Sequence, residues 1–241
     1  MSELFISDLH LAPAEPGTVQ TFLDFLAGPA RRAERLTILG DLFDYWAGDD
    51  DLADPFNARI VAALRTLSDR GVRLEFMAGN RDFLVGEDFA HAAGLTLLPD
   101  PCVRDIAGVK TLLTHGDALC TDDVDYQRFR AQVRDPAWRA AFLARPLADR
   151  KREIETLRMM SETEKRHKPA EIMDVNADAV TAWFVEHRAE ALIHGHTHRQ
   201  GRHEYVLNGK ICTRWVLGDW HPGRGNALFC EPAGWRWLDL R

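Results

Sequence analysis

The sequence predicts an α/β fold with a mainly parallel sheet, a helical insertion, and a second sheet near the end of the chain. Two patterns lead to this expectation. Short apolar runs alternate with segments of helical spacing, which is typical of parallel strands joined by crossover helices. Later, two strand-like runs flank Asn208-Gly209, and this dipeptide is a strong signal of a hairpin and hence of a second, antiparallel sheet.

Most of the predicted parallel strands lie in the first half of the chain. Strands are expected at residues 3–7, 36–39, 73–77 and 109–114. A helix is indicated by the apolar spacing of Val19, Phe22, Phe25 and Leu26, and another by the pattern of residues 55–70, which Gly71 would cap. This alternation continues with a short helix before residue 109.

Between residues 122 and 168 the alternation gives way to charged amphipathic helices. From Arg128 to Lys168 there are twelve Lys and Arg against six Asp and Glu, although the whole chain has a formal net charge of −7. We therefore predict a core of residues 1–121 and 169–241 with a helical cap insertion at 122–168. Such a basic block either faces an anionic partner or forms an ordinary solvated helical face.

The alternation resumes after the insertion. A helix is predicted at residues 176–187 and a strand at 191–193, followed by the hairpin of 205–207 and 211–215. Four tryptophans in this last part are expected to pack in the second sheet rather than bind a cofactor, because aromatic side chains suit half-buried pleated surfaces. They are Trp215, Trp220, Trp235 and Trp237.

Composition excludes several classes of protein. A net charge of −7 argues against a general nucleic-acid coat protein. The four cysteines are widely separated and form no C-x-x-C pair, which argues against a zinc ribbon and favours reduced thiols in a cytoplasmic protein. The first strand begins almost at Met1, so no secretion signal is expected, and no run of eighteen apolar residues predicts a bilayer span.

Side chains that can bind metal ions follow five of the predicted strands. They are Asp8, His10, Asp41, Asn80, His115, His196 and His198. This mixture of carboxylate, carboxamide and imidazole suits Mn, Fe or Zn. Seven ligands are too many for one tetrahedral ion but suffice for two ions if one carboxylate bridges. Asp41 is the natural bridge because it is the only candidate in its segment and lies between the Asp8/His10 pair and the Asn80/His115 set.

Five motifs, in this order, resemble the signature of a known family. The blocks are Asp8-Leu9-His10, Gly40-Asp41, Gly79-Asn80-Arg81-Asp82, His115-Gly116-Asp117 and Gly195-His196-Thr197-His198. Each block alone is common, but five in sequence behind strand-like runs resemble the calcineurin-like metallophosphoesterases. The resemblance covers the whole core. It implies a two-sheet β-sandwich flanked by helices, with the helical cap inserted in it.

The resemblance also implies how the ligands divide between two ions. Asp8, His10, Asp41 and His198 would hold one ion, and Asp41, Asn80, His115 and His196 would hold the other. His194 either orients a ligand or only ends a strand. The implied reaction is metal-assisted hydrolysis of a phosphoryl group, in which two ions share a water and hold a phosphoryl oxygen. Asp44, in the same stretch as Asp41, has no metal role in the family.

Arg81 departs from the pattern of the family, many of whose members carry a histidine at this position that can protonate an alkoxide. An arginine donates no proton usefully at neutral pH, but its planar fork can clamp phosphate oxygens. We therefore infer a good leaving group that needs no general acid, such as the phosphate half of a diphosphate. The alternative is that Arg81 only balances the charge of Asp82.

Several longer stretches resemble one branch of the family, the UDP-2,3-diacylglucosamine pyrophosphohydrolases of lipid A biosynthesis. These stretches are residues 5–11, 40–46, 79–84, 172–176 and 217–220. The resemblance implies cleavage of the diphosphate of UDP-2,3-diacylglucosamine by two Mn²⁺ ions. Water would attack the phosphorus on the uridine side, releasing UMP and 2,3-diacylglucosamine 1-phosphate. It further implies a peripheral enzyme on the cytoplasmic face of the inner membrane, with no nucleic acid and no obligate protein partner.

The same branch suggests which residues contact the substrate. They are Asn80, Arg81, Asp123, Ser161, Lys165, Lys168 and His196, although relatives tend to carry a small polar residue in place of Lys165. The insertion's apolar side chains could form a slot for acyl chains, or could be ordinary helix packing. These side chains are Trp138, Phe142, Leu143, Leu157, Met159 and Met160.

Two other functions are compatible with the same motifs. The first is a hydrolase of the same superfamily that acts on soluble dinucleotides or phosphoproteins, for which an extended polar groove without the insertion would be expected. The second is a non-catalytic scaffold that keeps the fold, for which missing ligands would be the mark. All seven ligand positions are filled here.

Overall fold

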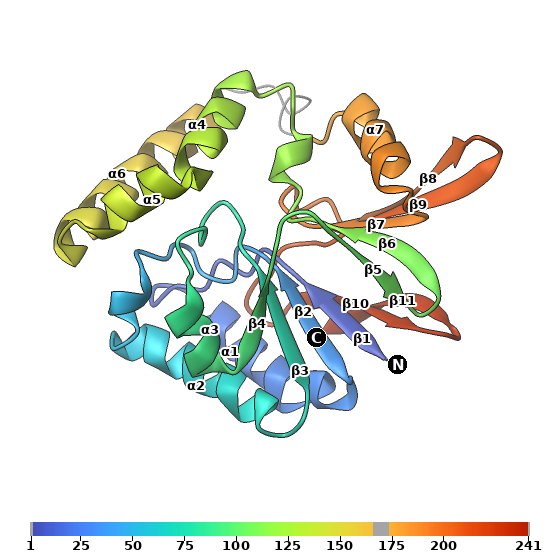
Figure 1. Cartoon of the computed structure of the whole chain (residues 1–241). Coiled ribbons are helices and arrows are strands. Elements are labelled where there is room, and N and C mark those ends of the chain that lie inside the picture. Colours follow the sequence, from blue (N-terminus) through green and yellow to red (C-terminus); the bar gives the residue numbers. More distant parts are fainter. Residues whose placement is uncertain (1, 166–173, 241) are drawn as a thin grey trace.

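Two mixed β-sheets face each other in the computed structural model (Figure 1), which describes residues 2–165 and 174–240, without the side chains of 160–165 and 239. The first sheet has the strand order β11-β10-β1-β2-β3-β4. β1 to β4 run parallel, and β10 joins β1 antiparallel. Its strands are β1 (Glu3–Ile6), β2 (Arg35–Leu39), β3 (Arg73–Met77), β4 (Leu95–Leu98), β10 (Gly225–Glu231) and β11 (Gly234–Leu240).

The second sheet has the strand order β5-β6-β7-β9-β8. Its centre, β6-β7-β9, is parallel, while β5 and β8 pair antiparallel at the edges. The strands are β5 (Cys102–Ile106), β6 (Val109–Leu113), β7 (Ala191–His194), β8 (Gly201–Leu207) and β9 (Lys210–Val216). The sheet is therefore mixed rather than antiparallel, because the predicted hairpin β8–β9 adds to β7. The hairpin turn is confirmed, with positive φ at Asn208 (51°) and Gly209 (75°).

Apolar side chains from both sheets meet in a core between them. Phe5 and Leu39 come from the first sheet, and Ile193 and Trp215 from the second. Trp215 packs against the rings of Trp235 and Trp237 of β11, so these three tryptophans are packing residues as predicted. Trp235 and Trp237 belong to the first sheet, however, and not to the second, where they were expected. Trp220 packs elsewhere, against Phe22 and Phe25 in the helical layer of the first sheet.

Helices cover the outer faces of the sheets (Figure 1). The first sheet packs against α1 (Pro16–Ala27), α2 (Pro55–Ser68) and α3 (Glu87–Ala93), and the second against α7 (Ala177–His187). α2 begins where its sequence predicts, since Pro55 is its first residue and Asp54 accepts hydrogen bonds from the N–H groups of Phe56 and Asn57. It ends at Ser68, and Gly71 follows with φ of +91°.

Three further helices lie together above the loops of the first sheet (Figure 1). They are α4 (Val124–Arg134), α5 (Pro136–Leu143) and α6 (Leu147–Lys165). Short 3₁₀ helices lie in loops elsewhere in the chain, and these are η1 (Pro29–Arg32), η2 (Asp49–Asp51) and η3 (Asp117–Leu119). The predicted cap boundary at residue 168 lies outside the described residues. Among the helices that the structure describes, none combines the length and apolar character needed to cross a membrane.

Candidate dimetal centre

All seven predicted ligands follow the carboxyl ends of strands from both sheets. Asp8 and His10 come after β1, Asp41 after β2, Asn80 after β3, His115 after β6, and His196 and His198 after β7. The loops after β1 and β2 are joined by backbone hydrogen bonds, because the N–H groups of Leu9 and His10 both donate to the Asp41 carbonyl. The strand ends thus bring the predicted ligands to one place.

Five of these seven ligands have a left-handed backbone. Their φ angles are 56° at Asp8, 48° at His10, 54° at Asp41, 66° at His196 and 58° at His198. A non-glycine residue with positive φ is uncommon and costs about 1 kcal/mol or more, so such residues tend to gather at functional sites. Because five such residues lie in these loops, the loops are expected to form a functional site.

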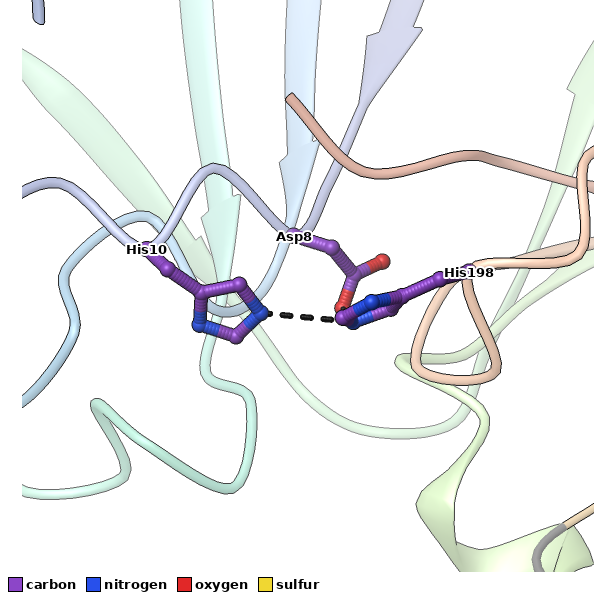
Figure 2. Close-up of side chains that lie close together, drawn as sticks. All are labelled: Asp8, His10 and His198. Atoms are coloured by element: carbon purple, nitrogen blue, oxygen red, sulfur yellow. Dashed lines mark hydrogen bonds and ion pairs between the residues drawn. The ribbon is translucent and has the colours of Figure 1, made fainter. Parts of the chain in front are cut away.

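One donor cluster consists of Asp8, His10 and His198 (Figure 2). Nε2 of His198 lies 3.3 Å from Nε2 of His10 and 3.4 Å from Oδ1 of Asp8. Asp8 is fully buried, and its Oδ1 atom has no hydrogen-bond partner of good geometry among the described residues. A buried carboxylate oxygen aimed at two imidazole nitrogens is an arrangement that a cation would complete.

A second cluster forms around Asn80. Its Oδ1 atom lies 2.9 Å from Nε2 of His115 and 2.8 Å from Nδ1 of His196. The other ring nitrogen of His115, Nδ1, donates to the Leu39 carbonyl at 2.8 Å. That bond fixes the ring so that Nε2 faces Asn80, the orientation that a metal-binding histidine needs.

Asp41 lies between the two clusters. Its Oδ2 atom is 3.9 Å from Nδ1 of His10, and its Oδ1 atom is 3.8 Å from Nε2 of His115. A Cβ atom at Gly79 would lie 2.1 Å from Oδ1 of Asp41, so only glycine fits beside this carboxylate. The two oxygens of Asp41 face different clusters, which is the position required of a bridging ligand.

The pKa values of these groups show an excess of negative charge. Burial and the nearby Asp82 and Asp8 raise the pKa of Asp41 to about 7. Burial alone would lower the pKa of His115, but the charge of Asp41 raises it to about 9. In the same way, Asp219 and Asp8 overcome the burial of His198 and raise its pKa to about 10. Protonated histidines therefore supply the positive charge that cations would bring.

These residues fit two divalent cations. The donors are carboxylate, carboxamide and imidazole groups, which suit Mn, Fe or Zn. The first cluster with Asp41 would hold one ion, and Asn80, His115 and His196 with Asp41 would hold the other. Asp8 also lies within reach of Asp41 and His115, which places the two sites side by side.

Arg81 lies next to the second cluster. Its backbone N–H donates to Oδ1 of Asp41 at 2.8 Å, and its side chain is half-buried. Among the described residues the Arg81 guanidinium has no ion pair. Asp82 is occupied by backbone N–H groups instead. The alternative that Arg81 only balances the charge of Asp82 therefore receives no support.

The other predicted substrate contacts lie on the helical segment. Asp123 caps α4 by accepting a hydrogen bond from the Tyr126 N–H at 3.2 Å. Ser161 and Lys165 belong to the last turns of α6, where the side chains are not described. Lys168 lies outside the described residues. Their contact with substrate therefore stays a prediction.

His194 is a structural residue rather than part of either cluster. It ends β7, and its Nδ1 donates to the Gly195 carbonyl at 2.8 Å while its Nε2 accepts from Arg214 at 3.2 Å. Burial and the charge of Arg214 lower the pKa of His194 to about 3. Its ring is therefore neutral and turned toward Arg214.

Two carboxylates near the site carry roles that the sequence pattern did not predict. Asp219, between β9 and β10, has Oδ2 3.4 Å from Nδ1 of His198 and so can orient that ring. Asp82 binds the backbone of the loops that hold Asp41 and Asn80. Asp82 belongs to one of the five motifs, so a local pattern in the sequence includes it. Asp219 lies far from His198 in the sequence, so no local pattern indicates that the two side chains meet.

Part of the basic segment faces acidic residues of the core. Arg150 is 1% exposed and pairs with Asp50, and its Nη1 atom donates to the Ala47 carbonyl. Two more ion pairs lie beside it, Lys151 with Asp51 at 2.7 Å and Arg158 with Asp44 at 2.5 Å. These two arginines and one lysine attach α6 to the loop of residues 44–54, which is one anionic surface that the basic segment meets.

The apolar residues of the helical segment fall into two groups. Trp138 stacks on Phe142 with ring centroids 4.8 Å apart, and both pack with Leu143 against the core. Leu157 and Met159 are exposed, at 37% and 66%. Helix packing thus explains the first three, while the side chain of Met160 is not described.

Comparison with known proteins identifies the family. The sequence profile described as calcineurin-like phosphoesterase matches residues 1–200. A protein of Aromatoleum aromaticum named UDP-2,3-diacylglucosamine hydrolase is 57% identical over 92% of this chain and 90% of its own. Proteins with the same name from Chromohalobacter salexigens and Stenotrophomonas maltophilia are 51% and 47% identical, over 93% and 98% of this chain and 91% and 97% of their own. The chain therefore belongs to the calcineurin-like phosphoesterase family.

Proposed function

We propose that this protein is a two-manganese hydrolase of UDP-2,3-diacylglucosamine in lipid A biosynthesis. It cleaves the diphosphate by attack of water on the phosphorus on the uridine side, and it releases UMP and 2,3-diacylglucosamine 1-phosphate. The observation that carries the proposal is the position of Asp41, whose two oxygens face His10 and His115 of two adjacent donor clusters. Three relatives that bear the name of this hydrolase support the choice of substrate.

The donor set determines which chemistry the site can perform. When bound, two divalent ions lower the pKa of water and draw charge from a phosphoryl oxygen. Asp41, whose Oδ1 and Oδ2 are directed to different clusters, would contribute a ligand atom to each ion. The ring of His115 is held by its bond to the Leu39 carbonyl, so its Nε2 needs no reorientation for catalysis.

Arg81 is the residue that favours a diphosphate as the substrate. Its guanidinium carries no proton that it can give up at neutral pH, but it can bind two phosphate oxygens at once. A diphosphate bond releases a phosphate that is stable without protonation, so a clamp rather than a general acid suits this position. Asn80, next to Arg81, supplies a carboxamide to the same region.

The helical segment, residues 122–168, is proposed as a cap that receives the acylated end of the substrate. Four apolar side chains of α4 and α6 are exposed by 37% or more, and they are Val124, Phe129, Leu157 and Met159. Exposed apolar side chains on a helix surface can contact acyl chains and a membrane surface. Asp123, Ser161, Lys165 and Lys168 would contact the substrate beside them, and the enzyme would act at the cytoplasmic face of the inner membrane.

A product assay tests this function. The purified protein is depleted of metal, reconstituted with Mn²⁺ and incubated with UDP-2,3-diacylglucosamine, and the products are identified by mass. We expect UMP and the diacylated sugar 1-phosphate, and neither product from the Asp41→Ala variant. A soluble dinucleotide and an aryl phosphate monoester are run in parallel. Faster cleavage of either one than of the UDP lipid would contradict the proposal.

A further inference from the structure

One face of α4 touches the three loops that carry the ligands of the second cluster, although one of them, the loop after β7, also carries His198 of the first cluster. Tyr126, Arg130 and Arg134 are spaced by four residues and so lie on the same side of the helix. Their contacts reach the loops after β3, β6 and β7. These are the loops of Asn80, His115 and His196, the second cluster described above.

Arg134 binds the loop of Asn80. Its Nη2 atom donates to the carbonyls of Ala78 at 3.1 Å and Gly79 at 3.0 Å, the two residues before Asn80. A guanidinium shared by two consecutive carbonyls fixes the direction of the following peptide. The same atom lies 3.9 Å from Oδ2 of Asp117, so Arg134 also connects this loop with the loop of His115.

Arg130 and Tyr126 bind the other two loops. The Nε atom of Arg130 donates to Oδ2 of Asp117 at 2.9 Å, and Tyr126 donates its hydroxyl to the same oxygen at 2.7 Å. Arg130 also pairs with Asp100 at 3.0 Å, which in turn accepts a hydrogen bond from Thr114 beside His115. The Tyr126 ring stacks on the His196 ring with centroids 5.9 Å apart.

The first cluster takes its support from the sandwich instead. The Ser7 hydroxyl donates to Oδ2 of Asp8 at 2.5 Å, and Asp219 lies beside His198. The two ion sites thus share Asp41 and are also joined by the His196 backbone N–H, which donates to Oδ2 of Asp8 at 2.9 Å. Of the loops that carry ligands, however, Arg130 and Arg134 contact those after β3 and β6 in the interactions described. One rests on the strands, and the other rests partly on a helix of the inserted segment.

We propose that Arg134 and Arg130 are positioning residues through which α4 sets the metal affinity of the Asn80–His115–His196 site and not of the Asp8–His10–His198 site. The inference rests on the proposed two-metal function. Outer groups that hold metal ligands in place typically change metal affinity by about 10- to 100-fold when they are removed.

Mn²⁺ titration of the metal-free protein tests this proposal by calorimetry and by electron paramagnetic resonance. The wild type is expected to bind two ions and to show the signal of a coupled pair. Arg134→Ala should bind one ion as the wild type does and the other about 10- to 100-fold more weakly. At low Mn²⁺ the variant should then show the signal of a single ion. Arg134→Lys, which keeps a charged donor, should recover part of the affinity.

Three controls separate positioning from general damage. Arg128→Ala removes an arginine of the same helix that is 77% exposed and pairs only with Asp125 among the interactions described, and it should bind both ions normally. Asp219→Ala should weaken the binding of Mn²⁺ at the Asp8–His10–His198 site. Circular dichroism verifies folding, and Arg134→Gln replaces the alanine variant if that variant does not fold.

The outcomes distinguish this inference from the proposed function. If the wild type binds fewer than two ions, the two-metal function itself is contradicted. If the wild type binds two ions and Arg134→Ala binds both with unchanged affinity, or weakens both equally, then α4 does not set the affinity of one site and the inference is overturned.

Discussion

Oδ1 of Asp82 accepts a hydrogen bond from the backbone N–H of Asp41 at 3.2 Å. The same oxygen accepts from the Gly79 N–H at 2.8 Å, and Oδ2 accepts from the Leu42 N–H at 2.8 Å. Asp82 is fully buried. One carboxylate therefore links the loop after β2 with the loop after β3, and it fixes the proposed bridge relative to Asn80.

Replacing Asp82 with Ala should destabilise the fold. Four backbone N–H groups, of Asp41, Leu42, Phe43 and Gly79, would lose a buried charged acceptor. The expected loss is about 2–4 kcal/mol of the free energy of unfolding. Urea denaturation of the metal-free protein measures it. Asp82→Asn keeps one carbonyl oxygen and should lose less. Equal stability of the alanine variant and the wild type would show that this carboxylate does not hold the two loops.

Replacing Asp41 with Ala should reduce the manganese content at both sites and nearly abolish turnover. The reason is that its two oxygens face different donor clusters. Elemental analysis after dialysis against Mn²⁺ measures the content. Asp44→Ala is the matched control, since Asp44 lies in the same loop but pairs with Arg158 of α6. Unchanged manganese in Asp41→Ala would contradict the assignment of Asp41 as the bridge.

Replacing Arg81 with Ala should lower kcat/KM for the UDP lipid by about 100-fold while both metal ions stay bound. Losing a charged, two-point contact to phosphate corresponds to about 3 kcal/mol, and each 1.4 kcal/mol is tenfold in rate. Steady-state kinetics with manganese analysis of the same sample is the measurement. Arg81→Lys should stay well below the wild type, because lysine lacks the planar fork. A variant that loses metal would assign Arg81 to the metal site instead.

The stability of the metal-free protein should fall as the pH falls from 6.5 toward 3, partly because of His194. Its pKa is about 3 in the folded state, below the usual 6.5. The unfolded chain therefore binds one more proton in this window, and the contribution is at most about 1.4 kcal/mol per pH unit. Urea denaturation at several pH values compares the wild type with His194→Gln, which should show a shallower slope. Identical slopes would mean that His194 is charged in the folded protein.

The strands that carry the ligands were predictable because each is a short run that becomes apolar and buried toward its carboxyl end. β1, β2 and β7 have four consecutive buried residues, whereas β3 and β6 are buried mainly in their last residues. β4 and β5 were not predicted, since they lie at sheet edges and are only partly buried. The pairing of β10 with β1 was not predictable either. It joins residues more than two hundred positions apart, and no local pattern encodes such a contact.

In the site, as in the fold, some features could be predicted from the sequence and others could not. The ligands follow strand ends within short motifs, so residue type and position sufficed to predict that Asp8, His10 and Asp41 meet. The groups that orient them come from distant segments. Asp219 reaches His198 from beyond β9, and Arg134 reaches the loop before Asn80 from α4. Their roles depend on tertiary packing, which hydrophobic period and motif spacing do not specify.

Hydrolysis of UDP-2,3-diacylglucosamine in ¹⁸O-labelled water tests the central claim most directly. If water attacks the phosphorus on the uridine side, mass spectrometry should find one ¹⁸O atom in UMP and none in 2,3-diacylglucosamine 1-phosphate. The reaction should depend on added Mn²⁺. Finding the label in the lipid product, or finding the same rate in the metal-free protein, would contradict the account.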